Sequence, residues 1–105
     1  MASFGYAAAI GAVTCAAMMW TPNASAQDYK ARAWAASCAS CHGTNGRGSD
    51  EIPALAGRSK ADLVTVLQEF KAGKRKTATI MHQHAKGYSH AQLERIAEYF
   101  SQQPR

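Results

Sequence analysis

The chain has 105 residues, 47% of them hydrophobic, and a formal net charge of +5 from 12 Lys and Arg against 7 Asp and Glu. That length allows one folded domain at most. A small basic protein can bind nucleic acid, but no basic segment interleaved with aromatic residues is present, so we expect no nucleic-acid partner. The positive charge instead favours electrostatic steering towards an acidic protein.

The first part of the chain has the pattern of a targeting segment. Residues 7–20 form an apolar run too short to span a bilayer well, and Ala24-Ser25-Ala26 is an A-x-A-like cleavage site, although no Lys or Arg precedes the run. We therefore interpret residues 1–26 as a secretory signal peptide that is removed, which leaves residues 27–105 as the mature domain. This predicts a periplasmic protein with no membrane anchor; an uncleaved anchor is the alternative.

The stretch Cys38-Ala39-Ser40-Cys41-His42 is a C-x-x-C-H motif. In this motif the two thiols bond covalently to a c-type haem, and the adjacent His is held close enough to bind its iron. A thioredoxin-like dithiol would require a βαβ setting, and a zinc site would require a second pair of ligands; the sequence has neither pattern. A covalent haem would also stabilise a domain too small for a large core of its own.

The elements around this motif are predicted to be helices and tight loops. Residues 28–37 are rich in Ala and predict a helix that buries Tyr29, Ala33 and Ala36 on one face. Residues 43–50 are rich in Gly and predict a loop that turns the chain around the edge of the haem.

Pro53 lies eleven residues after His42. A proline there restricts the backbone and leaves its carbonyl free, so we predict that this carbonyl accepts a hydrogen bond from His42 Nδ1–H and orients the ring. Leu55 would then pack on the proximal face of the haem. The alternative is an ordinary loop proline followed by a buried leucine.

Two further helices are marked by their caps. Ser59 and Asp62 form an approximate capping box, after which an apolar stripe runs to a stop at Gly73; Ser89 and Gln92 form a second box before a terminal helix. The stripes should be core, the second packing against the first helix: Leu63, Val66, Leu67 and Phe70, then Leu93, Ile96, Ala97 and Phe100. Lys71, Lys74, Arg75 and Lys76 cluster after the first stripe, either as a solvated helix end or as part of a docking surface.

The segment from Lys74 to Tyr88 is predicted to be a loop that supplies the sixth iron ligand. Met81 is the one methionine after residue 26, and a thioether opposite a histidine favours ferrous iron and raises the reduction potential. His82 and His84 compete for this role, and ligation by two histidines would lower the potential. The residues themselves leave these alternatives open.

Five segments carry a resemblance to a known family: C-A-S-C-H, I-P-A-L-A-G, E-F-K-A-G, T-I-M-H-Q-H-A-K-G-Y-S and I-A-E-Y-F. Together they resemble a class I cytochrome c, and most closely the mono-haem cytochrome subunit of flavocytochrome c sulfide dehydrogenase. The similarity runs from about residue 36 to 102. It implies an all-α fold of three to five helices around one covalently bound haem c, whose iron is bound by His42 and Met81.

The resemblance further implies an electron-transfer subunit, not itself an enzyme, that receives electrons from an FAD-containing flavoprotein which oxidises sulfide and passes them to other cytochromes. A free-standing soluble cytochrome c that shuttles electrons between respiratory or photosynthetic complexes is the alternative. A haem enzyme or gas sensor with a labile sixth ligand is a third hypothesis.

Overall fold

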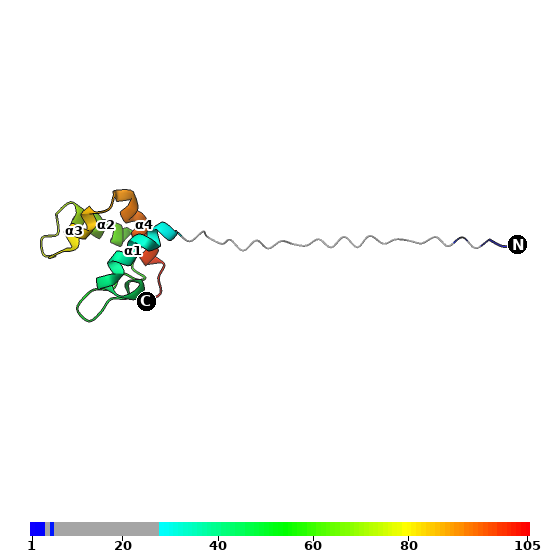
Figure 1. Cartoon of the computed structure of the whole chain (residues 1–105), viewed down its shortest axis with the longest axis horizontal. Helices are drawn as coiled ribbons and strands as arrows, with labels where there is room; N and C mark the ends of the chain where they lie inside the picture. The colour runs from blue at the N-terminus through cyan, green and yellow to red at the C-terminus, as the bar shows by residue number, and fades with distance from the viewer. Residues whose placement is uncertain (4, 6–27) are drawn as a thin grey trace.

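The computed structural model describes residues 1–3, 5 and 28–105, and the predicted signal peptide falls mostly outside these residues. In the described part every regular element is a helix, which confirms the all-α prediction (Figure 1). Residues 28–105 contain no helix long and apolar enough to cross a membrane. The elements in chain order are α1 (Tyr29–His42), the 3-10 turn η1 (Thr44–Gly46), α2 (Lys60–Lys71), α3 (Met81–Lys86) and α4 (His90–Ser101).

Helix α1 begins after Asp28, whose side chain accepts a hydrogen bond of 3.0 Å from the backbone N–H of Ala31. It does not end near Ser37, as the Ala-rich segment suggested, but continues through the whole C-x-x-C-H motif to His42. Gly43 follows with a φ of 83°, a conformation that glycine adopts without steric cost. The two cysteines and the histidine are therefore presented by one rigid element.

The predicted buried face of α1 is wrong. Tyr29 is 71% exposed, and Ala33 and Ala36 are exposed as well, whereas Ala31 and Ala35 are each 1% exposed. Because alanines occur on both the buried and the exposed sides of this helix, helical periodicity could not select one face. Cys38 and His42 lie seven residues after Ala31 and Ala35, so they continue the same buried face of the helix.

Helices α2 and α4 follow their predicted caps. Ser59 Oγ accepts from Asp62 N at 3.1 Å, and both halves of the Ser89–Gln92 capping box are present. At the end of α2, Gly73 N donates to Phe70 O and Lys74 N donates to Glu69 O, which is the paired bonding of a Schellman motif at the predicted glycine.

The apolar stripes of these helices are buried to different degrees. All four predicted residues of α4 are at most 2% exposed, and Ile96, Ala97 and Phe100 form a buried cluster with Ala35 of α1 and Leu63 of α2. The predicted packing of α4 against α1 is thus confirmed, although through Ala35. On α2 only Leu63 is fully buried; Val66, Leu67 and Phe70 are half-buried, because the stripe extends beyond the contact with α4 towards α3.

The predicted loop from Lys74 to Tyr88 is partly wrong, because it contains the six-residue helix α3. No side chain caps its first turn. Ala85, which is 2% exposed, holds the helix against the rest of the fold. Tertiary contact with α2, rather than local sequence, stabilises an element this short.

Candidate functional site

The C-x-x-C-H motif occupies the last turn and a half of α1. His42 is 8% exposed, Cys38 is half-buried and Cys41 is exposed, and both cysteines are free thiols in this structure. Burial raises the pKa of the Cys38 thiol, which favours its protonated form. One helix end therefore places two thiols and one histidine close together, with Cys38 and His42 four residues apart on one face.

His42 is oriented by the loop that follows it. Its Nδ1 lies 2.7 Å from the carbonyl oxygen of Pro53, the predicted hydrogen bond. A carbonyl can only accept, so Nδ1 carries the proton and the lone pair of the imidazole is at Nε2. The ring is thus held in the tautomer that can bind a metal ion through Nε2.

The loop from Gly43 to Ala56 is tied together by backbone hydrogen bonds that place the Pro53 carbonyl. Gly46 O accepts from both Leu55 N and Ala56 N, at 2.7 and 2.9 Å, and Ser49 N donates to Ile52 O at 2.9 Å. Gly48 has a φ of 79°, and a Cβ there would lie 2.7 Å from Ala54 N and 2.9 Å from Ile52 O. Glycine is therefore required at 48 for the loop to close on the Pro53 segment.

Leu55 is half-buried and packs against the buried cluster of α1, α2 and α4. It does not line the hollow described below. Its predicted contact with a haem stays a prediction.

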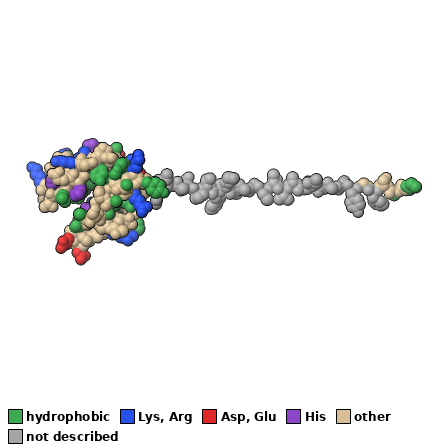
Figure 2. Space-filling model, viewed as in Figure 1, with side chains coloured by type: hydrophobic (Ala, Val, Ile, Leu, Met, Phe, Trp, Pro, Cys, Tyr) green, Lys and Arg blue, Asp and Glu red, His purple; other side chains and the backbone are tan. Residues whose placement is uncertain are grey.

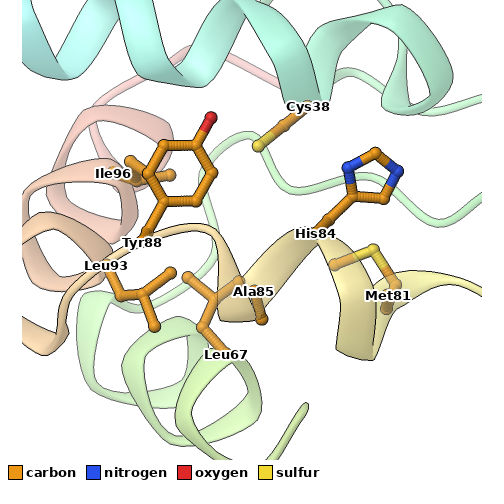
Figure 3. Close-up of a pocket in the computed structure, with 8 residues that line it drawn as sticks. All are labelled: Cys38, Leu67, Met81, His84, Ala85, Tyr88, Leu93 and Ile96. Carbon is orange, nitrogen blue, oxygen red and sulfur yellow. The ribbon is translucent and has the colours of Figure 1, made fainter. Parts of the chain in front are cut away.

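A hollow lies between α1, α2, α3 and α4, and Figure 3 shows the side chains that line it. Four of them come from α3 and the residues just after it, at i, i+3, i+4 and i+7 of a helical pattern that starts at Met81. The lining residues are Cys38, Leu67, Met81, His84, Ala85, Tyr88, Leu93 and Ile96. The hollow thus brings Cys38 of the C-x-x-C-H motif and Met81 together.

Ala85 and Tyr88 are the lining residues that sequence reasoning missed, although the i, i+4 and i, i+7 spacings from Met81 could have indicated them. The Tyr88 hydroxyl lies 2.7 Å from Ser37 Oγ of α1, and the Tyr88 carbonyl accepts from Lys71 Nζ of α2 at 2.5 Å. Tyr88 thereby fixes the chain between α3 and α4 to the other two helices. His82 is half-buried but is not among the residues that line the hollow.

Charges of opposite sign lie on two separate loops. Asp50 and Glu51 are exposed on the loop after η1, while Lys74, Arg75 and Lys76 are exposed on the connection from α2 to α3. Figure 2 shows acidic side chains at one tip of the molecule, apart from most of the basic ones. Arg75 pairs with Glu69 at 2.6 Å, and Lys71 is engaged by Tyr88. Of the predicted basic cluster, Lys74 and Lys76 are therefore the members best placed to meet a partner.

The residues present fit a covalently bound haem c. Two free thiols at the required spacing lie beside a buried histidine whose Nε2 carries the lone pair, and the hollow next to Cys38 is lined mainly by apolar side chains and one thioether. Thiol, imidazole and thioether are the groups that hold and ligate haem in c-type cytochromes.

Comparison with known proteins identifies the family of this chain. Residues 28–103 match the sequence profile of the family described as cytochrome c. Over 64 residues the chain is 50% identical to the cytochrome subunit of sulfide dehydrogenase from Chlorobaculum tepidum, a match that covers 61% of this chain and 57% of that protein. It is 38% identical over 69 residues to cytochrome c-554(548) from Halomonas halodenitrificans, covering 63% of this chain and 83% of that protein.

A solved structure is similar as well. The structure of cytochrome c4 from Acidithiobacillus ferrooxidans superimposes with a TM-score of 0.58 at 38% identity, over 61% of this chain and 37% of that one. The chain thus spans a little over half of the Chlorobaculum protein and about a third of the cytochrome c4 chain.

Proposed function

This chain belongs to the cytochrome c family and transfers electrons through a covalently bound haem c, and on that premise we propose that it works in a bacterial periplasm as the cytochrome subunit of a sulfide dehydrogenase. Haem c supplies an iron that accepts and releases one electron between its ferric and ferrous states. The chain's own residues must hold that group, ligate the iron and keep water away from it.

In this proposal Cys38 and Cys41 bond the haem to α1, and His42 binds the iron through Nε2. The observation that supports the role of His42 best is its 2.7 Å contact with the Pro53 carbonyl, because a histidine whose other nitrogen donates a hydrogen bond is a stronger and better oriented ligand. Leu55 would pack on the same side of the haem.

Met81 is proposed as the ligand on the opposite side. Its side chain lines the hollow next to Cys38, among the apolar residues Leu67, Leu93 and Ile96. These apolar neighbours would limit the access of water to a haem bound there, and a soft sulfur ligand favours the ferrous state. If His42 and Met81 both bind the iron, the chain would offer a substrate no open position there and would carry out no catalysis itself.

The proposed electron donor is an FAD-containing subunit that oxidises sulfide, and the proposed acceptors are other cytochromes. The 50% identity to the cytochrome subunit from Chlorobaculum tepidum supports this partner. The exposed Lys74 and Lys76 would steer the protein towards an acidic partner surface.

A free-standing soluble carrier is the second candidate. It is favoured by the match to cytochrome c-554(548), of which this chain covers 83%. Such a carrier would be monomeric, and its reaction with partners would slow steeply as salt screens Lys74 and Lys76.

The two candidates are distinguished by purifying the protein from its native host at low salt and recording the optical spectrum of each gel-filtration fraction. For the dehydrogenase subunit, we expect haem and flavin in a constant ratio, in fractions that elute at a larger particle size than the chain alone. Haem without flavin on a particle of the size of one chain would contradict that function and favour the free carrier.

A further inference from the structure

His84 is, with Met81, one of two residues of α3 that line the hollow and carry a metal-binding group, although His84 is also exposed to solvent. It lies three residues after Met81 on the same helix face, and both side chains line the hollow (Figure 3). His82, the other histidine of α3, is not among the lining residues. The hollow therefore contains one thioether and one imidazole, the two ligand types that suit a haem iron opposite a histidine.

The two ends of α3 are held very differently. At the start, Ile80 is 56% exposed, no side chain caps the first turn, and the connection before it consists of exposed residues apart from the half-buried Ala78. At the far end, Ala85 is 2% exposed and Tyr88 is bonded to both Ser37 and Lys71. A helix of six residues gains little from its own backbone hydrogen bonds, so its first turn can open while its last turn stays in place.

Met81 begins the loosely held first turn. His84 closes that turn, with its N–H donating to Ile80 O at 3.3 Å, but its carbonyl accepts from Gly87 N at 3.2 Å and it adjoins the buried Ala85. Opening the first turn would thus withdraw the thioether and leave the imidazole at the hollow. Resting on the proposed ligation of haem iron by Met81, we propose that His84 is a reserve axial ligand, which binds the iron when Met81 is lost or displaced and prevents an open sixth position.

The test compares three variants of the haem-loaded full chain: Met81→Ala, Met81→Ala/His84→Ala and, as the matched control, Met81→Ala/His82→Ala. Spin state is read from the optical and paramagnetic resonance spectra of the ferric protein at a pH of about 8, where free imidazole is neutral and free lysine amines are protonated. The first and third variants are expected to be low-spin, with the signature of two histidine ligands, and the second to be high-spin.

Binding of added imidazole provides a second measurement. If His84 occupies the iron in nine of ten molecules, the apparent affinity of Met81→Ala for imidazole is about tenfold weaker than that of Met81→Ala/His84→Ala. Equal affinities with high-spin spectra in both would overturn the proposal. Loss of the low-spin state in the His82 variant instead would assign the reserve ligand to His82 and overturn it too.

Failure of the proposed function would give results that differ from failure of the His84 proposal. A chain without covalent haem would show no haem stain on a denaturing gel, and a wild-type protein without the far-red absorption of thioether-bound ferric haem would contradict ligation by Met81. Both controls precede the comparison of variants. In the wild-type background, where Met81 is the proposed ligand and neither histidine is part of the buried cluster, His82→Ala and His84→Ala should each leave the free energy of unfolding nearly unchanged.

Discussion

Replacing Gly48 by Ala tests whether the loop after η1 positions His42. An added Cβ would lie 2.7 Å from Ala54 N and 2.9 Å from Ile52 O, both backbone atoms that flank Pro53 and cannot rotate away. The left-handed conformation, with a φ of 79°, is expected to cost about 1–2 kcal/mol for alanine, and the overlap about 1–3 kcal/mol more. The Pro53 carbonyl should then move relative to His42 Nδ1.

Gly73→Ala is the matched control. Gly73 has a φ of 71°, but no atom lies within 4 Å of the position that an added Cβ would take, so only the conformational cost applies. Urea unfolding of both haem-loaded variants should show a free energy of unfolding lower by about 1–3 kcal/mol in Gly48→Ala than in Gly73→Ala. Weakening the bond to Pro53 also makes His42 a poorer donor to ferric iron, so the reduction potential should rise in Gly48→Ala alone. Equal unfolding free energies and unchanged potentials would refute the reasoning.

Three further substitutions test the site and the fold. Met81→His should lower the reduction potential by on the order of 0.2 V, because imidazole replaces the thioether; an unchanged potential in a voltammetric titration would contradict ligation by Met81. Hydrogen bonds from the Arg95 guanidinium and, to a smaller extent, from the backbone N–H of Ala31 lower the pKa of Asp28 from its usual 3.8 to about 2. The Asp28 carboxylate therefore stabilises the fold above pH 3.8, and this contribution is lost as the pH falls through about 2. Asp28→Asn, which keeps the cap, should therefore be less stable than wild type at neutral pH and equal to it at the acid end of a pH series of urea unfolding; a difference that does not vary with pH would count against the ion pair. Phe100→Ala should lower the free energy of unfolding by about 3–5 kcal/mol, because Phe100 is 2% exposed, and a loss below about 1 kcal/mol would show that its site collapses around the smaller side chain.

Several elements could be predicted from local sequence because local chemistry determines them. The serine caps at Ser59 and Ser89 and the stop at Gly73 involve residues at most a few positions apart, and all three are present as predicted. In α4 the large apolar residues recur at helical spacing and the polar residues lie between them, so the sequence predicts a single buried face, and that face is buried.

The buried face of α1 could not be found in the same way. Alanine occurs on both the buried and the exposed sides of this helix, so hydrophobicity does not distinguish one side from the other. The choice of Ala31 and Ala35 follows from their position in line with Cys38 and His42, which face the interior, and from the packing of Ala35 against Ile96 and Phe100. Reading backwards from the motif by seven residues would have given the correct face.

The existence of α3 is also a tertiary effect. Six residues are too few to form a stable helix alone, and this one is held by contact with α2 and by the buried Ala85. Once the helix is present, Met81, His84 and Tyr88 share a face. That face is what separates His84 from His82, a choice that composition and spacing along an assumed loop left open.

The sequence by itself determined the chemistry of the attachment motif, the helical class of the fold and the caps of two helices, because each depends on residues that are close along the chain. Only the tertiary structure decided which face of α1 is buried, that Tyr88 ties the chain between α3 and α4 to α1 and α2, and which histidine of α3 lines the hollow. These depend on contacts between residues far apart in sequence, such as the 2.7 Å contact of Tyr88 with Ser37, and the periodicity of apolar residues alone does not encode them.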